Sequence, residues 1–219
     1  MNITVEIPDV TLGVIEAEEV RVAPASAELA AEMNAACEQL RRERSIEQVV
    51  DMPSVRAVRA MFRAWGVDPL RYRPSSEALL RRVVQGKGLY RVSNIVDLNN
   101  LGSIETAWPY GTYDHATLAP PVALRLGWTG EKYEGIGKQT WHLADRPVLV
   151  DGQGPFGSPI SDSMRTRITE ATSTVLTVVF APASSAAGAL EQALERHARR
   201  LERHTGARIR TTSVLIIQV

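Results

Sequence analysis

The chain has 219 residues, 44% of them hydrophobic and 23% charged, which favours one globular domain and excludes a disordered chain. The formal net charge is zero, but eight acids and one base give residues 1–40 a charge of −7, and twelve bases and five acids give residues 41–91 a charge of +7. A single cysteine, Cys37, excludes an internal disulfide, and the absence of a signal-peptide pattern or a long apolar run predicts a cytoplasmic protein without a membrane span.

The first 22 residues are predicted to form strands, and residues 23–88 a mostly helical, basic segment. Alternating apolar residues predict strands at Ile3–Ile7 and Val10–Val22. Ser26 is a suitable N-cap for a helix that continues to about residue 44, and residues 45–50 form a short helical or turn segment. The next helix begins at residues 52–54 and ends at Gly66, a residue type common just beyond a helix C-terminus.

Another helix is predicted from Pro74 or Ser75 to Gly86, and it carries Arg81 and Arg82 near its C-terminal end. Two interpretations of these arginines remain open. They are solvated charges that interact well with the helix dipole, or they face phosphate groups as part of a basic patch. The second interpretation groups them with three arginines near them in the sequence, Arg71, Arg73 and Arg91.

Residues 89–219 predict a mixed sheet with a C-terminal helix and strand. The expected elements are a helix at 94–106, a turn at 109–114, a strand at 122–126, an exposed hairpin within 128–137, a strand at 147–150, a loop at 152–165, a strand at 173–180, a helix from Ser184 or Ser185 to His204 that Gly206 ends, and a strand at 208–219. The order of elements is not a regular alternation of strand and helix. We therefore expect an α+β fold, a mixed sheet packed with several helices, in a single domain of residues 1–219.

The stretch from Tyr90 to Asp114 combines apolar residues with many amides, hydroxyls and carboxylates. Buried polar groups must find partners, so a half-buried polar element indicates a binding or catalytic site. The alternative, equally open, is a capped and buried helix whose amides bond local backbone groups. On a helix, Asn94 and Asp97 share one face, and Asn100 lies close enough to Asp97 to bond with it.

Several familiar sites are excluded. Residues 152–157 fit G-x-G-x-x-G, but Pro155 and Pro159 would interrupt the helix that a dinucleotide loop must open. The four histidines form no zinc-binding spacing, and His197 and His204 are predicted to be solvated. No G-x-S-x-G motif is present for a serine hydrolase. The sequence therefore predicts neither a metal site nor a cofactor.

Two segments carry a family resemblance. Asn94, Val96, Asp97, Asn100, Pro109, Tyr113 and Asp114 have the spacing of the first conserved block of the B3/B4 domain. R-Y-R-P-S-S-E-A-L-L-R-R-V, from Arg71 to Val83, is similar to a segment typical of free-standing bacterial proteins of this kind. The chain thus resembles the editing domain of the phenylalanyl-tRNA synthetase beta subunit, over most of its length.

The resemblance implies a tRNA-binding, editing-type protein whose partner is tRNA or aminoacyl-tRNA, and which hydrolyses the ester of a mischarged aminoacyl-tRNA in trans. Ester hydrolysis needs a positioned water and a stabilised oxyanion, not a strong nucleophile. The implied catalytic residues are Asn100, Asp97 and Asn99. The implied substrate-binding residues are Asn94, Glu105, Arg165 and Thr169. The implied nucleic-acid-binding residues are Arg71, Arg73, Arg81, Arg82 and Arg91.

The chain departs from the resembling domain at two positions. Gly111 stands where that domain has a histidine, and Thr177 or Val178 stands where it has a glutamate. Two alternatives to editing therefore stay open: a non-catalytic module that binds an amino-acid-like ligand, and a structural or interaction protein. The sequence predicts neither the amino acid, nor the tRNA, nor the oligomeric state.

Overall fold

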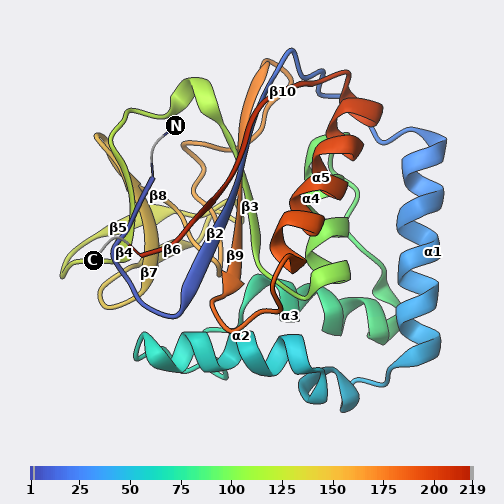
Figure 1. Cartoon of the computed structure of the whole chain (residues 1–219), viewed down its shortest axis with the longest axis horizontal. Helices are drawn as coiled ribbons and strands as arrows, with labels where there is room; N and C mark the ends of the chain where they lie inside the picture. The colour runs from blue at the N-terminus through green and yellow to red at the C-terminus, as the bar shows by residue number, and fades with distance from the viewer. Residues whose placement is uncertain (2, 218–219) are drawn as a thin grey trace.

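The computed structural model describes residues 1 and 3–217. Two β-sheets pack face to face, and helices cover the outer face of one of them and close one end (Figure 1). The arrangement confirms the predicted α+β class, although the described residues form two four-stranded sheets and a two-stranded hairpin where one mixed sheet was expected. One hydrophobic core extends from Ile3 to Ala207 through sheets and helices, and a smaller cluster around Tyr133 lies beneath a hairpin.

Sheet I is the mixed sheet, because its first pair of strands is parallel and the others are antiparallel. In spatial order its strands are β1 (Ile3–Val5), β4 (Val122–Leu126), β7 (Pro147–Asp151) and β8 (Gly154–Gly157). The prediction of a loop throughout 152–165 was wrong at β8. The glycines of that run allow a tight hairpin between β7 and β8, so it does not open a helix.

Sheet II is antiparallel throughout. In spatial order its strands are β10 (Arg208–Leu215), β2 (Val10–Glu18), β9 (Thr174–Pro182) and β3 (Tyr110–Asp114). Every residue of β9 except the first is buried, which explains its continuous apolar sequence. β2 ends four residues before the predicted Val22, because Glu19 adopts a left-handed φ of 60°. The predicted residues 218–219 of the last strand lie outside the described residues.

The predicted turn at 109–114 was wrong, because residues 110–114 form β3. Its residues pair with β9 from Tyr110 opposite Val179 to Asp114 opposite Val175. The reversal of the chain occurs earlier, at Ala107, which has a left-handed φ of 61°. Pairing with a fully buried neighbour therefore outweighs the turn propensity of Pro109 and Gly111.

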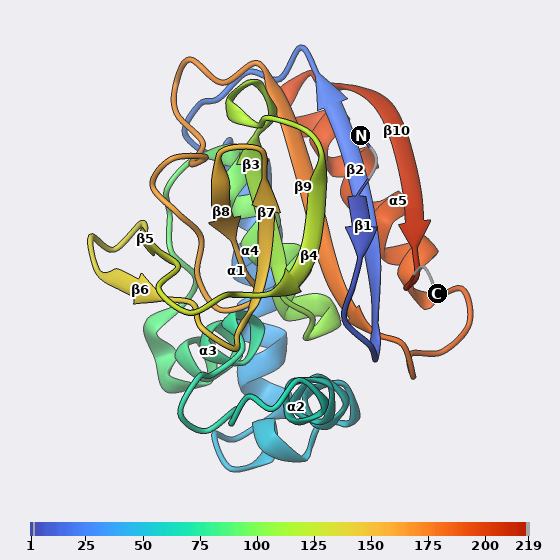
Figure 2. The same ribbon diagram turned by 90° about the vertical axis from the view of Figure 1, so that its left-hand side faces the viewer.

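The α-helices of the described residues cover one face of sheet II and one end of the molecule (Figure 1). They are α1 (Ala27–Glu43), α2 (Pro53–Ala64), α3 (Ser75–Arg82), α4 (Asn94–Thr106) and α5 (Ala189–Thr205). Shorter helical segments occur at Gln48–Asp51, Val83–Lys87 and His115–Thr117. α4 and α5 lie against sheet II, α1 lies outside them, and α2 and α3 close one end of the molecule (Figures 1 and 2). α5 starts after Gly188 rather than at the predicted Ser184 or Ser185.

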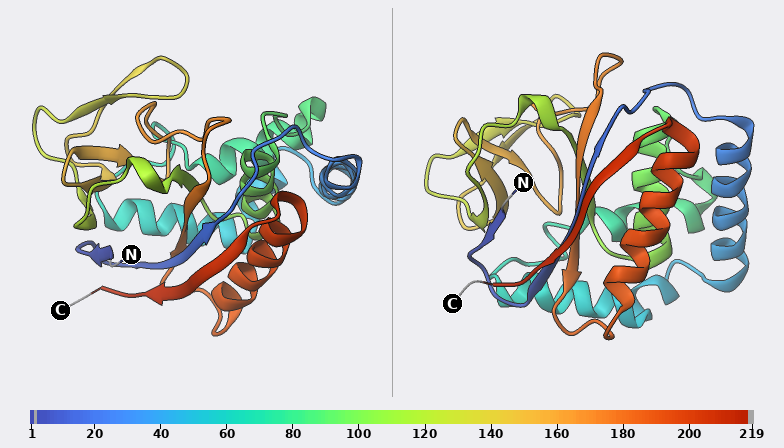
Figure 3. Two further views of the ribbon diagram at one scale, coloured as in Figure 1. Left: turned by 90° about the horizontal axis from the view of Figure 1, so that it is seen from above. Right: turned by 45° about the horizontal axis from the view of Figure 1, so that its top comes forward.

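A small hairpin projects beside sheet I (Figure 2). Its strands are β5 (Lys132–Glu134) and β6 (Thr140–His142), so it extends beyond the predicted end at residue 137. Seen from above, α1 lies at the opposite end of the molecule from this hairpin (Figure 3). None of the described helices combines the length and the hydrophobicity that a membrane span requires.

Asn94 fixes the start of α4. Its side-chain oxygen accepts a hydrogen bond from the backbone N–H of Ala23 at 3.1 Å, and its amide group donates to the carbonyls of Arg21 and His204 at 2.8 and 3.0 Å. Ser93 caps the helix by accepting a hydrogen bond from Val96. One amide thus joins α4 to the chain before α1 and to the end of α5.

Candidate functional site

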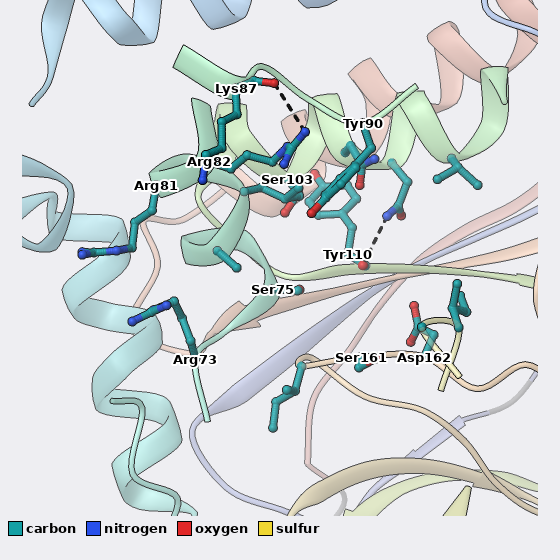
Figure 4. Close-up of a pocket in the computed structure, with 18 of the residues that line it drawn as sticks. Arg73, Ser75, Arg81, Arg82, Lys87, Tyr90, Ser103, Tyr110, Ser161 and Asp162 are labelled. Atoms are coloured by element: carbon teal, nitrogen blue, oxygen red, sulfur yellow. Dashed lines mark hydrogen bonds between the residues drawn. The ribbon is translucent and has the colours of Figure 1, made fainter. Parts of the chain in front are cut away.

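A cavity of about 670 Å³ opens between α3, α4 and the loop that follows β8. Its size is typical of sites that enclose a small ligand. Its walls combine cations, amides and one carboxylate (Figure 4). The polar and charged residues that line it are Arg73, Ser75, Arg81, Arg82, Gln85, Lys87, Tyr90, Asn99, Asn100, Ser103, Tyr110, Ser161 and Asp162.

The cationic wall comes from α3 and the segments on either side of it. Arg73, Arg81, Arg82 and Lys87 all line the cavity, and Lys87 is exposed. The Arg82 guanidinium lies 3.9 Å from the centre of the Tyr90 ring, a cation–π contact. Tyr90 is 52% exposed, so part of its ring surface remains open to solvent at the edge of the cavity.

The amide wall comes from α4. Asn99 is engaged, since its amide group donates to the carbonyl of Tyr110 at 3.3 Å and its oxygen accepts from the Thr112 hydroxyl at 2.8 Å. Ser103 is also engaged, because its hydroxyl donates to the carbonyl of Trp108 at 2.7 Å. The Asn100 side chain makes no hydrogen bond within the described residues and is half-buried. Asn100 is therefore the amide of the α4 wall that is available to a ligand.

Asp162 lies in the wall opposite the arginines (Figure 4). Its Oδ1 accepts a hydrogen bond from the Tyr113 hydroxyl at 2.8 Å and another from the Ser158 N–H at 3.2 Å. Burial raises the pKa of this carboxyl to about 7. Sequence reasoning missed Asp162 because it lies in a Gly-, Pro- and Ser-rich segment. The one signal that could have found it was the presence of a carboxylate in that segment.

Three of the predicted site residues lie on α4 but outside this cavity. Asn94 is buried with its amide fully bonded, as described above. Asp97 is 1% exposed, and its Oδ1 accepts from the N–H of Val92 rather than from Asn100, while burial raises the pKa of its carboxyl. Glu105 is exposed and pairs with Arg200 on α5 at 2.7 Å. Their side chains hold α4 in place.

Arg165 and Thr169, two further predicted substrate-binding residues, do not line this cavity either. Arg165 donates to both carboxylate oxygens of Asp151 at 2.9 and 3.1 Å, so its guanidinium is already occupied. The backbone N–H of Thr169 donates to the Thr172 hydroxyl in a local turn. The cavity wall instead comes from residues 160–162 of the same loop.

The five predicted phosphate-binding arginines divide into two groups. Arg73, Arg81 and Arg82 line the cavity. Arg71 lies outside it over the ring of Tyr72, at 5.2 Å. Arg91 is directed to α1, where it donates to Asn34 at 2.6 Å. Lys87 and Tyr90 line the cavity although the sequence did not single them out.

Positions 111 and 177–178 supply no acid or base. Gly111 faces Tyr113, whose hydroxyl occupies the volume that a side chain at 111 would need. The Thr177 hydroxyl lies 3.2 Å from that of Thr112, and Val178 is buried and apolar. Within the described residues, no group of three or more His, Cys, Asp or Glu side chains could hold a metal ion.

The prediction of solvated histidines on the last helix was wrong. His197 is 2% exposed, lies beside Gly102 and the Tyr110 ring, and has no hydrogen-bond partner among the described residues for either ring nitrogen. Burial lowers the pKa of His197 to about 4. The side chain of His204 is also covered, and its Nε2 lies 3.3 Å from Glu32. The many charged residues of α5 made both histidines look solvent-exposed in the sequence, although their side chains face inward.

Comparison with known proteins identifies a family. The model of the B3/4 domain matches residues 57–213. No curated protein matches the chain. Among solved structures, the chain is similar to an N-terminal fragment of the phenylalanyl-tRNA synthetase beta subunit from Pyrococcus horikoshii, with 16% identity and a TM-score of 0.46. That match covers 96% of this chain and 51% of the fragment, so the chain spans about half of the fragment's length.

Proposed function

The chain belongs to the B3/4 domain family, and from this premise we propose that it binds tRNA and hydrolyses the ester of a mischarged aminoacyl-tRNA in the cavity beside α4. The observation that carries the proposal is the meeting of four cations with a free amide in one cavity. A charged tRNA ends in phosphates, a ribose and a base, followed by an aminoacyl ester. A protein with this activity is expected in the cytoplasm, and we propose that location for this chain.

The cationic wall suits the nucleic-acid part of such a substrate. Arginine binds phosphate in a bidentate way, and neutralised phosphates contribute much of the affinity of proteins for nucleic acids. Tyr90 offers a partly exposed aromatic ring, backed by the Arg82 guanidinium, on which a terminal base can stack. Such stacking is worth about 1–3 kcal/mol per base and tolerates any sequence.

The amide wall suits the ester. The Asn100 amide group is a hydrogen-bond donor without a partner in the described residues, and it can bond the carbonyl oxygen on which negative charge develops. Asn99 cannot turn freely, because Tyr110 and Thr112 hold both ends of its amide. We assign Asn100 the contact with the ester and Asn99 a positioning role.

A panel of mischarged tRNAs tests the proposal. Purified protein is incubated with tRNAs that each carry a different non-cognate amino acid, and the release of that amino acid is followed against a reaction without protein. We expect release from at least one member of the panel, and tRNA binding on filters that weakens steeply with salt. Binding that is absent or insensitive to salt would contradict the proposal.

A second candidate is a module that binds an amino-acid-like ligand without cleaving it. The observation that favours it is the lack of an acid or base at 111 and 177–178. The same panel separates the two. Protection of α4 by free amino acids in hydrogen exchange, with no release from any charged tRNA, would favour the second candidate.

A further inference from the structure

Hydrogen bonds to its side chain hold Asp162 in place. Its Oδ1 is held by two donors, the hydroxyl of Tyr113 on β3 and the backbone N–H of Ser158. No group in residues 1 and 3–217 bonds to its Oδ2. Asp162 lines the cavity (Figure 4), and Asn100 is also among the lining residues. One carboxylate oxygen is thus fixed by the protein, and the other is left for a ligand or water.

Tyr113 is itself immobilised. It is fully buried, and its ring packs edge-on against Phe156 of β8 with centroids 4.9 Å apart. A side-chain carbon at either Gly111 or Gly157 would overlap its hydroxyl. The two glycines therefore form a slot between sheets I and II that admits the phenol and aims it at Asp162. A positioning group with so little freedom fixes the carboxylate as well.

The surroundings of Asp162 shift the pKa of its carboxyl toward neutral pH. Burial raises its pKa to about 7, whereas the hydrogen bonds from Tyr113 and Ser158 act in the opposite direction. The nearby phenols do not compete, because burial raises the pKa of both Tyr113 and Tyr133 and keeps them neutral. Arg73, Arg81, Arg82 and Lys87 are the other charged groups of this cavity. A general base works best when its pKa is near the working pH.

Resting on the function proposed above, we infer that Asp162 is the general base of this cavity. Its Oδ2 takes a proton from water as the water oxygen bonds to the ester carbonyl carbon, and Asn100 stabilises the oxyanion that forms. The bond from that carbon to the ribose oxygen then breaks. The ribose oxygen keeps the electron pair and receives the proton from Asp162. The products are a free amino acid and a tRNA with its terminal hydroxyl restored.

The assignment explains how the cavity can react without a histidine at 111 or an acid at 177–178. The volume above Gly111 is filled by the Tyr113 hydroxyl, which belongs to the positioning of Asp162. The acid–base group reaches the cavity from the loop after β8 instead of from sheet II.

The test is the pH dependence of single-turnover ester hydrolysis, on the most reactive tRNA of the panel and after subtraction of spontaneous hydrolysis. For the wild type we expect a rate that rises with pH, has its midpoint near pH 7 and then levels off. Asp162→Asn should lower the rate about 100-fold or more and remove this rise. Because asparagine can still accept the bond from Tyr113, we expect its melting temperature and tRNA affinity to stay near wild type.

Tyr113→Phe provides the second variant. It keeps the ring in its slot and removes one bond that favours the charged carboxylate, so the midpoint should move to higher pH. A role in packing alone would leave the midpoint where it is. An Asp162→Asn protein that hydrolyses the ester with the wild-type rate and pH profile would overturn the assignment alone. A wild type that releases no amino acid from any charged tRNA would overturn the proposed function and the assignment together.

Discussion

The guanidinium of Arg59 on α2 donates two hydrogen bonds, each 2.7 Å long, to the carboxylate of Glu77 on α3. Glu77 is 1% exposed, so the pair is well shielded from water on the carboxylate side. The same carboxylate lies 3.6 Å from Arg73 and 3.9 Å from Arg81, two of the cations of the cavity. Glu77 thus fixes α3 on α2 and sets the spacing of the cationic wall.

Replacing Glu77 by glutamine is expected to destabilise the protein strongly. The variant leaves the Arg59 charge without its carboxylate, and breaking a buried pair in this way costs about 3–5 kcal/mol. Urea denaturation measures the change in the free energy of unfolding. The matched control is Asp51→Asn, which breaks the pair of Asp51 with Arg56, two side chains more than 60% exposed, and should change stability by about 1 kcal/mol or less. Equal effects would contradict the structural role of Glu77.

Two asparagines of α4 are expected to behave in opposite ways. Asn94→Ala should lower the melting temperature with a cost of about 1–3 kcal/mol, because it removes three part-buried hydrogen bonds to the backbone groups of Arg21, Ala23 and His204. Asn100→Ala should leave the melting temperature near wild type and slow ester hydrolysis at least tenfold. Thermal unfolding and the release assay measure the two effects. Undiminished hydrolysis by Asn100→Ala would refute its contact with the ester.

Arg73 lines the cavity and Arg71 lies outside it, so the two residues allow the cavity to be compared with the general surface. Arg73→Gln should weaken tRNA binding and reduce the slope of log affinity against log salt by about one. Arg71→Gln removes an equal charge outside the cavity and should change neither quantity by a comparable amount. Filter binding over a range of salt concentrations measures both. Identical slopes for the two variants would show that only overall charge matters.

His197 is expected to make the protein sensitive to acid. Its pKa of about 4 in the folded state lies below the usual value of 6.5, so the unfolded chain binds a proton first as the pH falls. Its contribution to stability is therefore fully present above about pH 6.5 and is lost as the pH falls toward 4. His197→Leu should reduce this loss and, by removing an unpartnered ring N–H, should not destabilise the protein at pH 7.

Urea denaturation at several pH values between 7 and 4 measures the effect of His197. His142→Leu is the control, because His142 lies exposed on the hairpin. That variant should retain the wild-type acid sensitivity. If His197→Leu and the wild type lose stability in parallel, the buried imidazole does not cause the sensitivity.

Gly111→Ala is expected to destabilise the slot that holds Tyr113. The added carbon would overlap the phenol, and Gly157 on the other side leaves the ring no room to retreat. Overpacking of this kind costs about 1–3 kcal/mol. Gly137→Ala serves as the control, because an added carbon there meets nothing within 4 Å. A Gly111→Ala protein with an unchanged melting temperature would show that the slot is wider than described.

The sequence predicted α4 well and its orientation poorly. The polar caps and the length of the amide-rich run are local properties, and the observed bounds Asn94–Thr106 agree with them. Which side faces inward is not local, because apolar residues occur all round this helix and no stripe marks the core. Asn94 is buried because partners 71 and 110 positions away meet it there. Only tertiary structure supplies such partners.

The cavity walls illustrate the same limit. The cations and amides belong to compact segments with family-like spacing, so Arg73, Arg81, Arg82, Asn99 and Asn100 were all named from the sequence. Asp162 was not, since its partner Tyr113 is 49 positions away and the segment around it has the composition of an ordinary loop. Arg165 looked equally suitable, but it forms an ion pair with Asp151 at the end of β7. No sequence pattern predicts this pairing.

The position of β2 has a practical consequence for shortened versions of this protein. This strand, residues 10–18, lies between β9 and β10, yet it precedes residues 57–213, the part that the family model matches. A fragment trimmed to those limits would leave the last strand with no neighbour and would strip one edge of β9 bare. Such an exposed edge favours strand pairing between molecules, so the fragment should be isolated as aggregates rather than as a folded monomer.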